Sequence, residues 1–236
     1  MRRETFPASG PLRLDLSLPA GELEVDAAAV DEAVVELETL SGDESAIEKA
    51  RVELRGDELT VKVDRSKAEI RIRVQAPEGS ALRARTASGD VRTRGPLGAT
   101  EVKSASGDVS LESAASLDAK IASGDIGVDR IDGEARVDSA SGDVELGEVG
   151  GSVTVRTASG DQQVRSVAEG RVDLTSASGD IRVGVKQGSR VWVDARSMSG
   201  DVSSDIELDD EASGGDGPQV EVKVTAMSGD VEVVRA

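Results

Sequence analysis

The feature that most constrains this 236-residue chain is the triplet Ser-Gly-Asp, which occurs eight times between residues 88 and 230. Successive copies lie 17 to 21 residues apart, except for a final step of 29. Ala or Met precedes each Ser, and Val or Ile follows each Asp except where Gln162 takes that place. Repetition this regular indicates one structural unit used many times. The eight corner glycines are Gly89, Gly107, Gly124, Gly142, Gly160, Gly179, Gly200 and Gly229.

Apolar residues alternate with polar ones on both sides of each triplet, as in Val153/Val155 before it and Ile181/Val183 after it. Alternation with a period of two is typical of strands. A unit of about 18 residues cannot bury its apolar side alone, so neighbouring units must stack through backbone hydrogen bonds. The pattern therefore predicts an all-β fold, a single-chain β-solenoid. An antiparallel sandwich would not need the same corner at every second turn.

The triplet itself is expected to form a corner of each coil. Counting alternate positions from Val102 places Ser104 and Ser106 inward before the corner and Val109 inward after it. The period of two breaks between Ser106 and Val109, and glycine tolerates the positive φ that such a bend requires. Asp after the bend can accept backbone N–H bonds. We interpret the corners as structural.

Stacked corner aspartates also allow a metal interpretation. Carboxylates in adjacent coils, about 4.8 Å apart, would repel, and Ca²⁺ binding would relieve that repulsion. One Asp per coil supplies few ligands unless carbonyl groups contribute. We therefore expect no cofactor, and a calcium ladder remains the alternative. Its ligands would be Asp108, Asp125, Asp143, Asp161 and Asp180.

The residues before the serines form the most regular strip of the repeat. If alternation runs unbroken to the corner, a narrow Ala/Met strip faces outward. If the parity flips earlier, Ser and Thr form the outward ladder instead, as on ice-binding solenoids. In either case this strip is the candidate docking face for another chain or an N-terminal segment. Its members are Ala105, Ala122, Ala140, Ala158, Ala177 and Met198.

The two ends of the sequence depart from the repeat. Residues 1–82 alternate without the exact corner and predict an irregular cap of strands, continuous with the regular solenoid 83–236 in one domain. A short helix is expected from Asp43 to about Ala50. Residues 205–218 predict an acidic solvated loop. After this loop, Val220 to Val233 is expected to close the stack, and Trp192 to point outward against a neighbouring coil or the loop.

Composition excludes several kinds of chemistry. The chain has no Cys, His or Tyr, so thiolate or Ser-His-Asp catalysis and the usual zinc and haem sites are absent. A formal charge of −18 disfavours binding to nucleic acid or to an anionic membrane surface. No apolar run is long enough for membrane insertion, and the first residues lack a secretory signal. We therefore expect a cytoplasmic protein, with surface exposure only if a leader has been removed.

Several segments resemble the bacterial and archaeal "putative adhesin" family of β-strand repeats, a domain of unknown function. They are the Thr/Ser-Ala-Ser-Gly-Asp-Val corners from Thr86 onward, Glu4-Thr5-Phe6, the segment Arg51-Val-Glu-Leu-Arg-Gly, Val191-Trp-Val-Asp and Met198-Ser-Gly-Asp-Val. The resemblance covers nearly the whole chain. It implies a single-chain β-solenoid without defined catalytic residues.

Three classes of function follow. We favour a non-enzymatic repeat scaffold that presents a regular face to a protein or cell-envelope component. The alternative is a Ca²⁺-dependent binding module. The third is a polysaccharide-acting enzyme, which we disfavour because the chain lacks aromatic platforms for sugars and its carboxylates repeat as a ladder rather than standing out as one pair.

Overall fold

The computed structural model describes residues 1–64, 68–206 and 218–236. Its described elements are strands apart from one short helix, and the fold is the predicted all-β solenoid. The chain divides into two compact units, Met1–Gly124 and Asp125–Ala236, and each is described by itself. The predicted single domain, with its regular part beginning at residue 83, stays a prediction. The predicted acidic loop 205–218 lies almost wholly outside the described residues.

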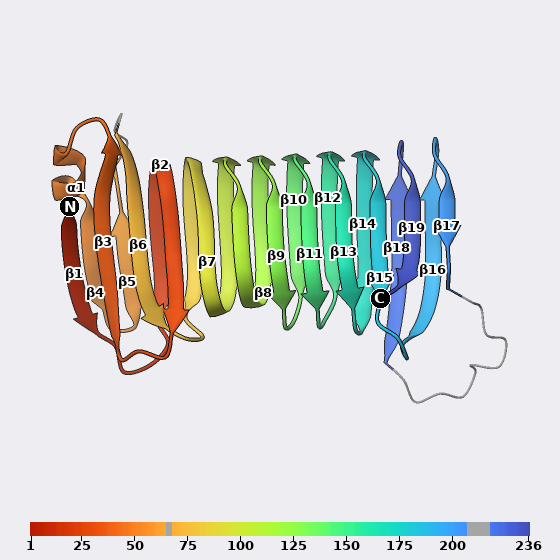
Figure 1. Cartoon of the computed structure of the whole chain (residues 1–236), viewed down its shortest axis with the longest axis horizontal. Coiled ribbons are helices and arrows are strands. Elements are labelled where there is room, and N and C mark those ends of the chain that lie inside the picture. The colour runs from red at the N-terminus through yellow and green to blue at the C-terminus, as the bar shows by residue number, and fades with distance from the viewer. Residues whose placement is uncertain (65–67, 207–217) are drawn as a thin grey trace. The chain divides into compact units, whose positions relative to one another are not determined.

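The first unit contains eight strands and the helix (Figure 1). They are β1 (Arg2–Pro7), β2 (Arg13–Ala28), β3 (Glu32–Ser41), α1 (Ser45–Lys49), β4 (Arg51–Arg55), β5 (Glu58–Lys62), β6 (Glu69–Pro77), β7 (Ala81–Ser106) and β8 (Val109–Ser123).

The second unit contains the remaining strands. They are β9 (Ile126–Ile131), β10 (Ala135–Ser141), β11 (Val144–Val149), β12 (Val153–Ser159), β13 (Gln162–Val167), β14 (Gly170–Ser178), β15 (Ile181–Val185), β16 (Arg190–Ser197), β17 (Val202–Ser204), β18 (Gln219–Ala226) and β19 (Val231–Arg235).

Parallel in-register pairing builds the second unit. In one layer β11 lies between β9 and β13, and in the other β12 lies between β10 and β14. The register puts like residues side by side, as in the row Ile126, Val144, Gln162 and Ile181. Alternate residues of the interior strands are buried between the two layers, which form the core. Apolar rows of this kind are what parallel stacking of identical units produces.

The alternation breaks one residue earlier than expected. Ser104 is buried as predicted, but both Ala105 and Ser106 are exposed before Val109 is buried again. The inward position assigned to Ser106 is therefore wrong. The strand ends at this serine and the bend begins there, so its side chain already lies on the outer surface of the corner.

In the first unit, one strand lies out of sequence order. The second half of β2 pairs with β6 on one side and with β7 on the other. Gly21 of β2 pairs with Gly89, so β2 forms a coil with its own glycine corner although it lacks the triplet. Regular stacking thus includes a strand from the segment predicted as an irregular cap.

Charge on the outer face favours this order at the position of Glu24. Glu24 of β2 pairs in register with Arg73 of β6 and with Arg92 of β7. If β6 paired directly with β7 in the same register, these two arginines would face each other. Opposite charges across neighbouring strands stabilise a sheet, and like charges destabilise it.

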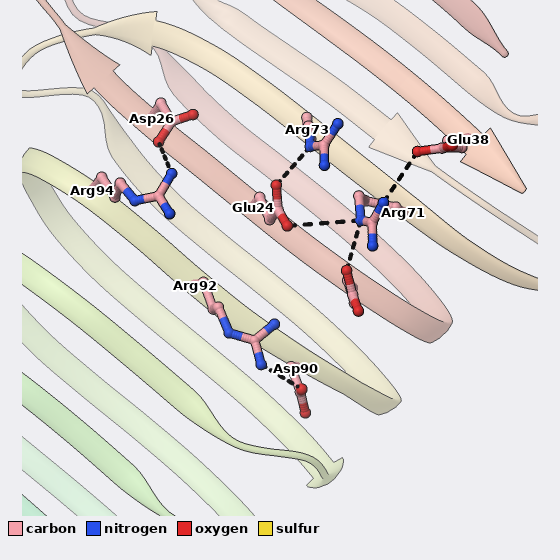
Figure 2. A network of polar contacts seen from close by, with 9 residues as sticks. Glu24, Asp26, Glu38, Arg71, Arg73, Asp90, Arg92 and Arg94 are labelled. Atoms are coloured by element: carbon pink, nitrogen blue, oxygen red, sulfur yellow. Dashed lines mark hydrogen bonds and ion pairs between the residues drawn. The ribbon is translucent and has the colours of Figure 1, made fainter. Parts of the chain in front are cut away.

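The row of alternating charges continues across five strands. Arg3 of β1 pairs with Glu36 of β3, and Glu36 pairs with Arg73. Figure 2 shows the contacts around Glu24, whose Oε2 accepts a hydrogen bond from Arg73 Nε at 2.7 Å. Arg71 reaches Glu38 at 3.2 Å and Glu22 at 2.6 Å. The network fixes which strands are neighbours and in what register.

The second unit also has strands out of order, and here the sequence-based expectation is wrong. Strands β18 and β19 do not close the stack: β18 lies between β14 and β16, and β19 between β15 and β17. The edge coil is therefore β16/β17, which precedes them in sequence (Figure 1). The inward residues of β18 (Val220, Val222 and Val224) are fully buried, whereas Val191 and Val193 of β16 are only half-buried. The more apolar strand takes the interior place.

Antiparallel strands cover the edge of the first unit. β4 pairs with β5, while β3 pairs with β6 and carries β1 on its other side. The predicted helix is present as α1, after Asp43, whose Oδ1 accepts a hydrogen bond from the Ser45 amide at 2.9 Å. Arg2 Nη1 donates to the carbonyl groups of Ile47 and Ala50 at 2.9 and 2.6 Å, which ties the helix to β1.

Candidate interaction surface

The corner aspartates form a hydrogen-bonded ladder in each unit. In the first unit, the Asp108 amide donates to Asp90 Oδ1 at 3.1 Å. In the second unit, each amide donates to the carboxylate of the preceding coil, at 2.8 to 2.9 Å. The carboxylates that accept these bonds are, in spatial order, those of Asp125, Asp143, Asp161, Asp180 and Asp230. Each aspartate thus satisfies a backbone donor that the bend leaves without a strand partner.

The corner glycines meet two constraints at once. Seven of the eight have φ between +116° and +146°, the exception being Gly89. In addition, a Cβ on Gly160 would lie 2.2 Å from the carbonyl oxygen of Gly142, and one on Gly179 would lie 2.2 Å from that of Gly160. The same closeness recurs at Gly107, Gly124, Gly200 and Gly229. Only glycine combines this backbone conformation with such close stacking.

The residue before each serine is exposed along the whole strip, from Ala105 to Met198, as set out above. The corresponding inward positions are occupied by buried Ser104, Ser139, Thr157 and Ser176. The parity is therefore the one in which Ala and Met face solvent, and the serines of the triplets, such as Ser141 and Ser159, are exposed beside them in register.

In the second unit the strip changes character from small to large residues. Its spatial order follows the strand register, so Ala140, Ala158 and Ala177 are followed by Met227 and then Met198. The two methionines are 60% and 84% exposed. Met227 was not among the predicted docking residues, although the Met-Ser-Gly-Asp pattern it begins was a sufficient signal. The strip now comprises the six predicted residues and Met227.

The proposed calcium ligands lie in the ladder, one per coil, and one oxygen of each of Asp125, Asp143, Asp161 and Asp180 accepts a backbone hydrogen bond. Within residues 1–64, 68–206 and 218–236, no group of three or more acidic side chains could hold a metal ion. The ladder uses these carboxylates for backbone hydrogen bonds.

A hollow of the first unit has a volume of about 330 Å³ and lies over β2, β5, β7 and β8. Its charged lining is paired: Arg83 Nε donates to Glu101 Oε2 at 2.8 Å, and Arg13 Nη2 to Asp57 Oδ1 at 2.6 Å. Hydrogen bonds from Lys103 and Arg83 lower the pKa of Glu101 to about 2. This carboxylate stays ionised near neutral pH, so it does not serve there as a general acid.

The solenoid of parallel coils with glycine corners defines a class of repeat protein. The model of the Toastrack DUF4097 family matches residues 48–234, and the chain belongs to that family. No curated protein is recognisably similar in sequence.

Three solved structures are similar to the chain at low sequence identity, and the first of them shares the fold. A "putative adhesin" from Parabacteroides distasonis is 14% identical, with a TM-score of 0.55 over 98% of this chain and 97% of that one. A "putative adhesin" from Bacteroides fragilis is 12% identical, with a TM-score of 0.46 over 98% and 96% of the two chains. A "putative lipid binding protein" from P. distasonis is 13% identical, with a TM-score of 0.39 over 98% and 96%.

The helix content is limited to α1 in the described part of the chain, and no helix there has the length and apolarity to cross a bilayer.

Proposed function

We propose that this protein is a non-enzymatic, adhesin-like scaffold that binds a protein or cell-envelope component through the Ala/Met strip. The observation that carries the proposal is the exposure of this strip beside a corner held by hydrogen bonds in every coil. A flat row of small apolar side chains allows close approach of a partner, and the two large methionines supply contact area. Membership of a family whose relatives are described as adhesins is consistent with this role.

The strip is suited to binding because its side chains are already held in position before a partner binds. Each Asp–amide bond and each positive-φ glycine fixes the neighbouring Ala or Met in space. A surface that loses little freedom on binding retains more of its contact energy as affinity. The partner's chemistry would be apolar at the centre of the contact and polar at its rim, where exposed Ser159 and Asp161 lie.

The test is capture of partners from envelope and soluble extracts of the source cells on the immobilised full chain. The strip variant carries Ala105→Lys and Ala140→Lys, one change in each unit. The matched control carries Ser110→Lys and Gln163→Lys, at exposed outward positions of β8 and β13. We expect a protein or envelope component that wild type and control retain and that the strip variant loses by at least about tenfold.

Equal capture by the strip variant and the control would overturn the proposal, provided that all three proteins melt at the same temperature. Fractionation of the source cells would test the expected cytoplasmic location separately.

A further inference from the structure

The edge coil of the second unit, β16/β17, has an unpaired side among the described residues. β16 pairs with β18 and β17 with β19, and no other described strand pairs with either. An open strand edge of this kind is a template for another strand.

The backbone of β16 shows which groups are available. The amides of Arg190 and Met198 donate to carbonyl groups of the segment 218–226 at 2.9 and 3.1 Å. In a parallel strand the N–H and C=O of one residue point to the same side and successive residues alternate. The N–H and C=O groups of Val191, Val193 and Ala195 therefore point to the unpaired side.

Large apolar side chains surround this edge. Trp192 is 52% exposed and Val202 is 47% exposed, in addition to the exposed Met198. Val202 follows the corner Asp, a position at which Ile181 and Val231 are buried. Val202 is exposed because no further coil covers the edge in the described part of the chain, whereas Trp192 and Met198 are at outward positions beside this edge.

We propose that β16 pairs antiparallel with β16 of a second copy of this chain, about a two-fold axis at Ala195. In this register Val193 is opposite Ser197 of the second copy, and both residues present their backbone groups to the shared edge. On the outer face Asp194 is opposite Arg196 of the second copy, and Trp192 is opposite Met198. Each of these contacts occurs twice because the interface is isologous.

The side chains select this register over its neighbours. An axis at Asp194 would place two aspartates opposite each other, and an axis at Val193 would place Arg190 opposite Arg196. Like charges directly opposite destabilise a strand pair, whereas opposite charges and a sulfur–aromatic contact stabilise it. The axis at Ala195 is the one of the three that pairs every outward side chain favourably.

Net charge opposes this association. Each copy carries a formal charge of −18, so two copies repel at long range. Salt screens that repulsion, and we therefore expect the dimer to tighten as ionic strength rises from about 0.05 M to about 0.3 M. An interface held mainly by exposed ion pairs would weaken over the same range.

The experiment is sedimentation of the full chain from about 1 µM to about 1 mM, with the dissociation constant fitted from the weight-average mass. We expect wild type to dimerise in this range. Ala195→Pro removes an amide that faces the open edge and no hydrogen bond to β18, so it should abolish the dimer. Arg196→Asp places acids opposite each other and should weaken the dimer at least about tenfold.

The charge swap Asp194→Arg with Arg196→Asp restores opposite charges across the two-fold axis. It should recover the dissociation constant to within about threefold of wild type. Arg196 also donates to Asp194 within its own strand, at 2.9 and 3.1 Å, and the swap keeps opposite charges there as well. The readout is therefore the dissociation constant of the dimer, compared at matched melting temperatures.

A monomeric wild type over the whole range would overturn the inference, as would a dimer that Arg196→Asp and Ala195→Pro leave unchanged. A dimer that the single variant weakens but the swap does not restore would also overturn it. The lysines that test the Ala/Met strip are at residues 105 and 140, outside β16, so the proposed function and this interface can fail independently.

Discussion

Both units place strands out of sequence order, β2 in the first and β18 with β19 in the second, and in both an outward residue of a displaced strand carries the opposite charge to its partners in register. In the first unit Glu24 lies in register between Arg73 and Arg92. In the second unit Lys223 of β18 lies in register between Asp173 of β14 and Asp194 of β16. Without the displaced strand, two arginines would be opposite in one unit and two aspartates in the other.

The inward residues distinguish one coil from another only weakly, because most are Val, Leu or Ile. The outer face carries the information that decides which coils are neighbours. The units differ at their edges: antiparallel strands and α1 cover that of the first, whereas β16/β17 leaves Trp192 and Val202 exposed. The segments that cover the edge of a unit are therefore determined separately from the order of its coils.

The largest expected effect is loss of a corner glycine, which tests whether the corners are equivalent in the two units. Gly107→Ala and Gly160→Ala each place a Cβ within 2.4 Å of a neighbouring carbonyl oxygen at positive φ. We expect each to lower the free energy of unfolding by about 3–5 kcal/mol, measured by urea denaturation. Gly127→Ala is the control, because a Cβ there meets nothing within 4 Å. A loss in only one unit would break the equivalence.

Charge reversal on the displaced strands tests the proposed reason for their order. Glu24→Arg creates a row of arginines on β6, β2 and β7, and should lower the free energy of unfolding by about 1–2 kcal/mol. Lys223→Glu should cost less, about 0.5–1 kcal/mol, because Lys223 is exposed. The neutral variants Glu24→Gln and Lys223→Gln separate repulsion from simple loss of a partner. If reversal costs no more than neutralisation, charge does not set the order.

The two units also differ in the core, in the row of residues that directly follow the corner aspartates, and we expect a smaller effect on stability there. That row is apolar in the first unit at Val91 and Val109, but contains Gln162 in the second. Gln162 Nε2 donates to Thr157 Oγ1 at 2.7 Å, while its buried Oε1 has no partner among the described residues. We expect Gln162→Ile to raise the free energy of unfolding by about 1 kcal/mol. Exposed Gln163→Ile should change it little, and a loss at residue 162 would contradict the expectation.

The smallest expected effect concerns pH and the first unit. The pKa of Glu101 is lowered to about 2 by Lys103 and Arg83, below its value of about 4.5 in the unfolded chain. A depressed pKa in the folded state contributes stability that is complete above about pH 4.5 and is lost as pH falls towards 2. Glu101→Gln should therefore be less stable than wild type at pH 6, and the difference should shrink steadily as the pH falls from about 4.5 towards 2. A difference that does not change with pH in urea denaturation would exclude the ion pair as its cause.

Local patterns in the sequence were sufficient to predict the coils, their glycine corners and the short helix. Each of these depends on residues close together in the sequence, such as the bend at Gly160 or the hydrogen bond from the Ser45 amide to the Asp43 carboxylate. The exposed side of the Ala/Met strip could not be chosen, because alternation breaks at Ser106 rather than within the following two residues. If the position of a bend is uncertain by one residue, the face assigned to every side chain of the preceding strand is uncertain as well.

The order of the coils was not predictable from spacing. The long step before Ser228 was interpreted as a loop ahead of the last coil, since periodicity does not say which side of β16 the returning strand will occupy. That choice depends on charges brought together only in the fold, such as Lys223 and Asp194, and on the stronger apolarity of Val220, Val222 and Val224. Spacing likewise could not predict that Gly21 pairs with Gly89, across almost 70 residues of chain.

The interior position of β18 and β19 has a consequence for synthesis on the ribosome. Residues 190–204 leave the exit tunnel before residues 219–235, yet β16 and β17 pair with β18 and β19 rather than with β14 and β15. The nascent chain therefore cannot add this coil in the order of translation, although domains generally fold from the N-terminus first. Residues 190–204 can form their final strand pairs only after residues 219–235 have been synthesised.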